Sequence, residues 1–250
     1  MKSLKWVNTL AFAAMVTVNA LANLIPIGGN TTGEVSAAYP TLFTPAPITF
    51  SIWGLIYALL LLFVLYQWGK GGESLVYELG PWFAASCLMN IAWIFAWHLG
   101  AIELSLAYMA GLLISLIAIE RSLPEKGRGW LYRLGAEAGF AIYLGWIIAA
   151  TIANVSVVLV KLGWNGFGLS EQFWTVAVLL FGALLTVITV LRSGRRLTGA
   201  AVLWAYGGIL LRHVGHSFLA GEYPVIIGTL IVCMICLAGT VLISLFSEQT

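Results

Sequence analysis

Aspartate is absent from this 250-residue chain, and charged residues of all kinds make up only 9% of it, against 61% hydrophobic residues. Soluble domains carry about 25% charged residues, so this scarcity excludes an ordinary soluble fold and indicates a polytopic membrane protein. The net charge of +2 is too small to predict a nucleic-acid partner. All three cysteines fall in apolar stretches, which argues against a disulfide framework.

The chain also lacks the common catalytic signatures. It contains no H-E-x-x-H, no G-x-S-x-G, no phosphate-binding P-loop and no paired carboxylates inside an apolar stretch. We therefore predict no catalytic residue.

Long apolar runs are abundant, and each is long enough to cross a bilayer as a helix. The fold class that they predict is all-α, a polytopic membrane helix bundle of about eight transmembrane helices. The connections are short and leave no room for a soluble domain. The predicted spans are residues 5–27, 48–68, 80–98, 101–119, 136–160, 171–192, 198–217 and 223–246.

The basic residues test this count. With eight spans, one side of the membrane receives ten of the twelve Lys and Arg residues, and the other side receives only Lys161 and Arg212. Basic residues accumulate on the cytoplasmic side of membrane proteins. We therefore predict an integral membrane protein with both termini in the cytoplasm.

Aromatic side chains occur at two depths. Tryptophans near span ends, such as Trp97 and Trp174, are expected at the headgroup level, where an amphipathic indole is favoured. Others lie some turns inside their spans, where the indole N–H needs a partner, either in the bundle core or in a ligand site. These deeper tryptophans are Trp53, Trp93, Trp146 and Trp204.

Polar side chains inside the spans leave alternatives open. Asn90 and Asn154 either form hydrogen bonds between helices or present donors to a ligand. His213 and His216, three residues apart beside Arg212, are weak candidates for a metal or haem-iron site; otherwise they make interfacial polar contacts.

A G-x-x-x-G pattern at the start of the fifth span predicts a close helix approach. It is formed by Gly135 and Gly139. The approach serves either packing within the chain or a homodimer.

Three motifs carry a family resemblance. A proline-rich entry precedes a W-x-x-x-Y pattern in the second span, MNIAW lies in the third, and YLGWIIAATIAN lies in the fifth. Their order and spacing resemble the TspO/MBR family, the tryptophan-rich sensory proteins and the mitochondrial translocator protein. The resemblance covers about residues 5–160. This chain departs from the family pattern at Pro47, Ala149 and Val158, where many members carry aromatic residues, and this leaves the identity of the ligand open.

The resemblance implies a five-helix bundle over residues 1–160, with a pocket capped by the 28–47 loop, and a three-helix extension over residues 161–250. Family ligands are hydrophobic molecules such as porphyrins and sterols, so a tetrapyrrole such as a porphyrin or haem is expected as ligand rather than as a resident cofactor. The pocket residues implied are Trp53, Tyr57, Asn90, Trp93, Tyr143, Trp146, Thr151 and Asn154.

The predicted function is thus that of a binding or sensory protein in a membrane, expected to be a bacterial cytoplasmic membrane. The alternatives are a small-molecule transporter and a structural or assembly subunit of a larger membrane complex. Light-dependent porphyrin degradation, proposed for some relatives, is the one enzymatic activity that the resemblance leaves open.

Overall fold

A computed structural model describes residues 2–25, 27–124, 129–215 and 219–247. Within these ranges the regular structure is entirely helical, as the apolar runs predict. Helices suit a bilayer because each satisfies its backbone hydrogen bonds internally. In chain order the elements are α1 (Lys2–Leu24), η1 (Ile27–Gly29), α2 (Thr32–Ala37), η2 (Pro47–Ser51), α3 (Ile52–Tyr66), α4 (Gly72–Leu79), α5 (Trp82–His98), α6 (Ile102–Ser122), α7 (Trp130–Tyr132), η3 (Arg133–Ala138), α8 (Gly139–Lys161), η4 (Gly166–Gly168), α9 (Glu171–Ser193), α10 (Arg196–Val214) and α11 (Pro224–Ser247).

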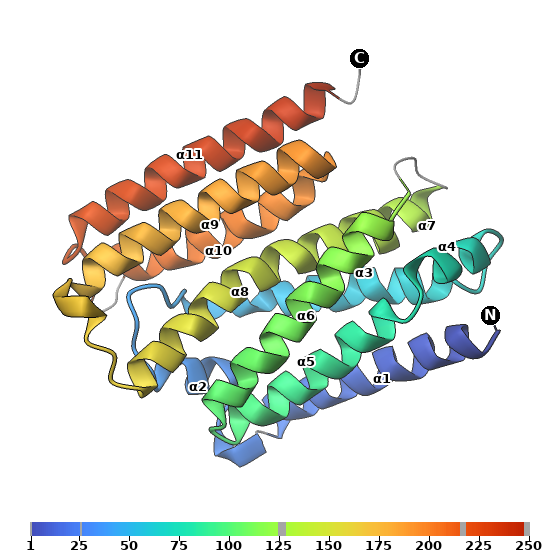
Figure 1. Cartoon of the computed structure of the whole chain (residues 1–250), viewed down its shortest axis with the longest axis horizontal. Coiled ribbons are helices and arrows are strands. Elements are labelled where there is room, and N and C mark those ends of the chain that lie inside the picture. The colour runs from blue at the N-terminus through green and yellow to red at the C-terminus, as the bar shows by residue number, and fades with distance from the viewer. Residues whose placement is uncertain (1, 26, 125–128, 216–218, 248–250) are drawn as a thin grey trace.

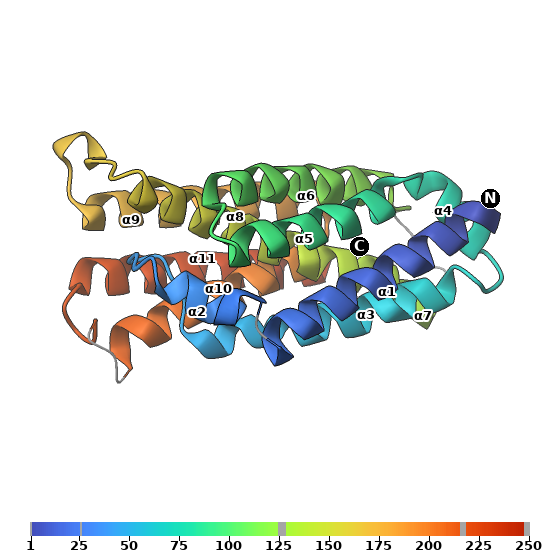
Figure 2. The ribbon, with the colours of Figure 1, turned by 90° about the horizontal axis from the view of Figure 1, so that it is seen from below.

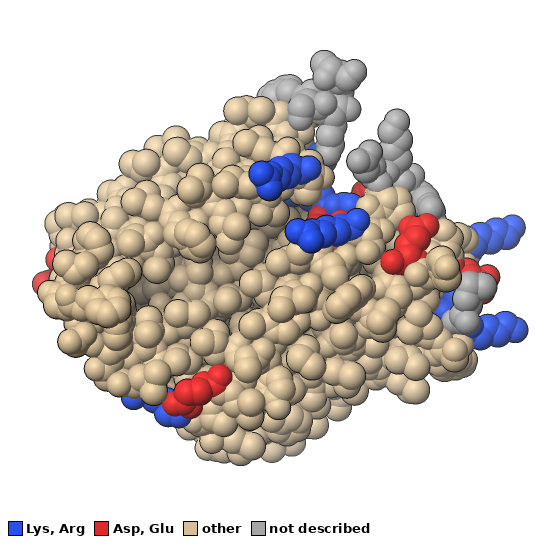
Figure 3. Space-filling view, in the orientation of Figure 1, with Lys and Arg blue, Asp and Glu red and all other residues tan. Residues whose placement is uncertain are grey.

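The described residues contain seven helices long and apolar enough to cross a membrane, or eight if α4 and α5 count as one span bent by 63°. Each corresponds to one of the predicted spans. The protein is therefore a polytopic membrane helix bundle. Its two termini lie at the same end of the molecule (Figure 1). On the face shown in Figure 3, charged side chains gather mainly toward that end, and most of the middle of this face carries no charge.

Helix α8 is the centre of the arrangement. It packs against α6 on one side and against α10 on the other. Helices α1, α3, α5 and α6 lie on one side of it, and α9, α10 and α11 form a group on the other (Figures 1 and 2). A division of the chain at residue 160 stays a prediction, because α8 packs with both groups.

Glycines allow α8 and the π-helical segment η3 to approach their neighbours. A Cβ on Gly135 would lie 2.4 Å from the backbone nitrogen of Phe63 in α3, and a Cβ on Gly139 would lie 3.3 Å from Leu59. The G-x-x-x-G pattern thus serves packing within the chain, one of its two predicted uses. A homodimer stays a prediction.

The 28–47 loop, which is predicted to cap the pocket, contains the short helix α2. The Thr31 hydroxyl accepts from the Glu34 backbone N–H, and the Glu34 carboxylate accepts from the Thr31 backbone N–H, which together form a capping box. The hydrogen bonds from the Thr31 backbone and side chain lower the pKa of Glu34. Beyond α2 the chain crosses toward α10 and then enters η2 and α3.

Candidate ligand cavity

Aromatic rings from three helices meet around Trp53 of α3. Trp53 stacks on Tyr57, with ring centroids 5.5 Å apart, as expected for residues four apart on one helix face. Its ring also lies 6.4 Å from Trp93 of α5, and 5.7 Å and 6.2 Å from Tyr143 and Trp146 of α8. The structure thus brings together the five aromatic residues that the motifs singled out.

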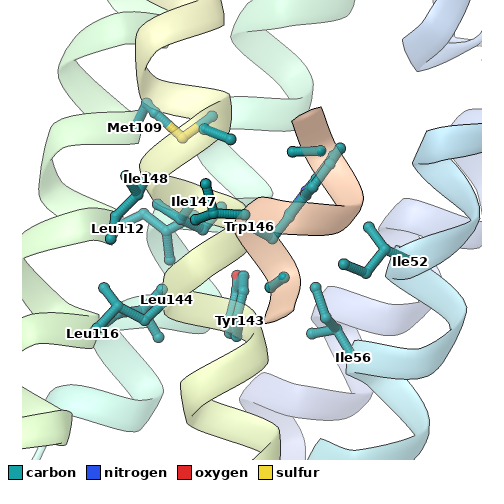
Figure 4. Close-up of a cluster of buried hydrophobic side chains, with 14 of the residues drawn as sticks. Ile52, Ile56, Met109, Leu112, Leu116, Tyr143, Leu144, Trp146, Ile147 and Ile148 are labelled. Carbon is teal, nitrogen blue, oxygen red and sulfur yellow. The ribbon is translucent and has the colours of Figure 1, made fainter. Parts of the chain in front are cut away.

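The close-up in Figure 4 shows how α8 divides its side chains. Leu144, Ile147 and Ile148 lie beside the apolar residues of α6, whereas Tyr143 and Trp146 lie on the side of α8 that faces α3. One face of the helix therefore forms an aliphatic core, and the other contributes rings to the aromatic cluster.

Asn90 joins three helices. Its side-chain oxygen accepts from Asn19 of α1 at 2.6 Å, and its side-chain nitrogen donates to the Tyr143 hydroxyl at 3.1 Å. Asn90 is fully buried. Both its polar atoms are therefore engaged within the protein, which is the interhelical alternative of the two predicted.

Asn154 plays a similar part at the other end of the cluster. Its oxygen accepts from the indole N–H of Trp93 at 3.1 Å, and its nitrogen donates to the Ser105 hydroxyl of α6 at 3.1 Å. Unlike Asn90, it also lines a cavity beside the rings.

This cavity encloses about 50 Å³ between α2, the 38–46 segment, η2, α3, α5, α8 and α10. None of the described residues that line it is charged. Sites for drug-sized ligands hold about 300–1,000 Å³, so a tetrapyrrole enters only if rings or the covering segment move. The lining residues are Thr32, Ser36, Phe43, Pro45, Phe50, Trp53, Trp93, Trp97, Trp146, Ala149, Ala150, Ala153, Asn154, Val157, Ala205 and Ile209.

Trp146 has an unusual position in this cavity. Its side chain is 3% exposed and its ring packs edge-on against Trp53 and Phe50. Its indole N–H has no acceptor among the described residues, and the buried Tyr57 hydroxyl also lacks a partner there. A buried N–H without an acceptor is costly at membrane depth, so Trp146 offers a donor to any ligand that enters.

Four of the eight predicted pocket residues line the cavity: Trp53, Trp93, Trp146 and Asn154. Tyr57, Asn90 and Tyr143 lie behind them within the cluster. Thr151 points elsewhere and lines a separate groove between α8 and α9, with its hydroxyl donating to the Ile147 carbonyl of its own helix.

Two further tryptophans, Trp97 and Trp204, differ in how far the bundle buries them. The Trp97 side chain is 4% exposed, stacks on Trp93 at 5.7 Å and donates to the Thr32 carbonyl, so it belongs to the aromatic cluster; its place at the headgroup level stays a prediction. Its spacing of four residues from Trp93 was the signal for its place in the cluster. Trp204, predicted to lie deep in its span, is 46% exposed and donates to the Thr49 carbonyl.

The segment over the cavity is bound to α10. The Ala46 N–H donates to the Gly208 carbonyl at 2.9 Å, and Arg212 donates to the Thr44 carbonyl at 3.3 Å. A Cβ on Gly208 would overlap the Thr49 side chain. Helix α10 therefore supports the segment that closes the cavity, a role that no local pattern in the sequence indicates.

His213 takes part in the same support. Its Nε2 lies 2.9 Å from the Leu42 carbonyl, and its ring packs edge-on against Tyr223. This contact occupies Nε2, whereas Nδ1, the other ring nitrogen, has no hydrogen-bond partner among the described residues. His216, the other weak metal candidate, lies outside the described residues, and the described residues contain no group of three His, Cys, Asp or Glu side chains placed to hold a metal ion.

The fold and the cavity identify the chain as a polytopic helical membrane protein whose internal cavity is lined by tryptophans. A family model described as "TSPO-like protein" matches residues 5–243, and the chain therefore belongs to the TSPO-like family. The match continues past residue 160 into α11, farther than the motifs reached. No curated protein and no solved structure matched the chain.

Proposed function

We propose that this protein is a membrane-embedded binding protein with a sensory role, and that its ligand is a flat hydrophobic molecule of the tetrapyrrole class. Membership of the TSPO-like family and the charge-free, tryptophan-lined cavity support this proposal. The observation that carries it is the buried indole N–H of Trp146, which has no acceptor among the described residues.

In this proposal the rings of Trp53 and Trp93 stack on the ligand, and Trp146, which lies edge-on to Trp53, donates its N–H to a polar atom at the ligand edge. Asn154, Asn90, Tyr57 and Tyr143 hold these rings in position. Thr151 has no part in this cavity. The ligand makes room for itself by displacing the 38–46 segment from the aromatic cluster. Because α10 binds this segment, ligand binding is coupled to the C-terminal helices, which supports a sensory role.

An absorption titration of the full chain in lipid nanodiscs with protoporphyrin IX tests the proposal. We expect a saturable Soret band, and we expect Trp146→Phe, which keeps a ring and removes the N–H, to weaken binding by about two- to tenfold, the worth of one neutral hydrogen bond. The matched control is Trp130→Phe, because Trp130 is 65% exposed and remote from the cluster. A titration without saturation, or equal affinities for the wild type and Trp146→Phe, would contradict it.

A further inference from the structure

A second hollow lies between α8 and α9 and has a volume of about 650 Å³. It is the recess visible between these helices on the face shown in Figure 3. Phe43 is the only described residue that lines both this groove and the aromatic cavity. The groove is therefore a separate space, more than ten times larger, with one shared wall.

The groove walls belong to the bilayer-facing surface. Val155 and Val160 of α8 and Phe181 of α9 are 38%, 43% and 60% exposed, and both helices are long and apolar enough to cross a membrane. Helix α8 packs mainly on α6 and α10, and α9 packs mainly on α11. Helices α8 and α9 thus leave a space between them at membrane depth. Apolar groups fill such a space most favourably, and the acyl chains of lipids are the apolar groups that the bilayer supplies.

One end of the groove is polar and carries a single charge. Glu171, at the start of α9, is the only charged residue among the described residues that line the groove, and its Oε1 accepts from the Leu42 N–H at 2.8 Å. Beside it the Trp164 and Trp174 rings lie 5.0 Å apart, and Trp174 is fixed by a hydrogen bond to the Gly166 carbonyl. A carboxylate next to indole faces is the chemistry that recognises an ammonium group.

We propose that this groove binds a phospholipid whose headgroup ends in an ammonium, with one acyl chain between α8 and α9 and the ammonium beside Glu171. The tryptophan pair marks the headgroup level, which places the charge and the chain at the depths that such a lipid requires. No Lys or Arg lines the described groove, so an anionic headgroup without an ammonium finds no counter-charge there. This site does not depend on tetrapyrrole binding.

Native mass spectrometry of the delipidated full chain tests the proposal, with phosphatidylethanolamine and phosphatidylglycerol of identical chains added in equal amounts. The wild type is expected to retain phosphatidylethanolamine preferentially. Glu171→Gln keeps an oxygen for the Leu42 N–H but removes the charge, and we expect it to lower the preference by about threefold, the size of an exposed charge pair. Glu73→Gln, on α4 at the other end of the molecule, is the matched control.

The acyl-chain part of the site is tested by Val155→Trp, which fills the groove from its rim. It is expected to abolish retention of the lipid, whereas Val232→Trp on the exposed surface of α11 is expected to have no effect. Retention unchanged in Val155→Trp, a headgroup preference unchanged in Glu171→Gln, or no retained lipid in the wild type would each overturn the proposal.

Discussion

At the scale of single residues, the aromatic cluster is held together by amides rather than by charges. Asn90 and Asn154 each accept from one helix and donate to another, so the rings of Trp93 and Tyr143 are fixed through their polar atoms. In a bilayer such bonds have no competing water. Trp146 and Tyr57 differ, because the buried indole N–H of Trp146 and the Tyr57 hydroxyl have no partner among the described residues.

Replacement of Asn154 tests this account of the cluster. Asn154→Leu keeps the number and branching of the side-chain heavy atoms but leaves the Trp93 N–H without its acceptor, and we expect it to lower the free energy of unfolding by about 1 kcal/mol. Thermal unfolding in detergent measures the loss. Thr189→Val, an exposed site on α9 whose hydroxyl bonds only to its own helix, is the control and is expected to change little. Equal stability of Asn154→Leu and the control would mean that the amide does not hold the cluster.

At the scale of helices, small residues set how closely α8 approaches its two neighbours. Gly135 in η3 faces the backbone of α3, and Gly145 faces the backbone of α10. Lipid gives little hydrophobic drive for helices to associate, so close van der Waals contact of this kind stabilises the bundle. Because α10 in turn binds the segment over the cavity, the α8–α10 contact also determines the shape of the cavity.

Gly145→Ala tests the importance of this contact. Its Cβ would lie 2.3 Å from the Thr198 carbonyl oxygen and 2.8 Å from the Ala201 Cβ, and both neighbours are rigid. We expect a loss of about 1–3 kcal/mol of stability from the forced separation. Gly54→Ala, in α3 with no atom within 4 Å of the new Cβ, should not destabilise the protein. Thermal unfolding of the two variants side by side measures the difference. Equal stability of Gly145→Ala and Gly54→Ala would mean that the α8–α10 contact is loose.

At the scale of the whole molecule, the spans were predictable because membrane burial imposes long apolar runs. The meeting of Trp53, Trp93 and Trp146 was predictable from three motifs. The position of Thr151 was also predictable from the sequence. Thr151 follows Trp146 by five residues, and in a helix this spacing turns its side chain about 140° away from that of Trp146. The structure places Thr151 accordingly, in the groove rather than in the cavity.

Other features had no local signal. The docking of Leu42 and Thr44 on α10 joins residues about 170 positions apart, through backbone carbonyls that any residue supplies. The small size of the cavity likewise depends on how side chains from seven parts of the chain fill one space. Neither property can be read from hydrophobic periodicity or from a motif.

The membrane orientation remains a prediction that whole-molecule labelling can check. Tyr77, 75% exposed on α4, and Leu162, 64% exposed after α8, are placed by the eight-span topology on the cytoplasmic and the opposite side. In intact cells, a membrane-impermeant maleimide is expected to label Leu162→Cys at once and Tyr77→Cys only after permeabilisation. The reverse pattern would invert the topology.

We propose that the aromatic cavity is the ligand site and that the Trp146 N–H donates to the ligand. The most direct measurement is the ¹⁵N–¹H spectrum of the tryptophan indoles in nanodiscs, with the Trp146 signal assigned through Trp146→Phe. On addition of protoporphyrin IX, we expect the Trp146 signal to shift downfield as it gains an acceptor, while the signal of exposed Trp130 stays in place. A bound porphyrin that leaves the Trp146 signal unmoved would contradict the claim.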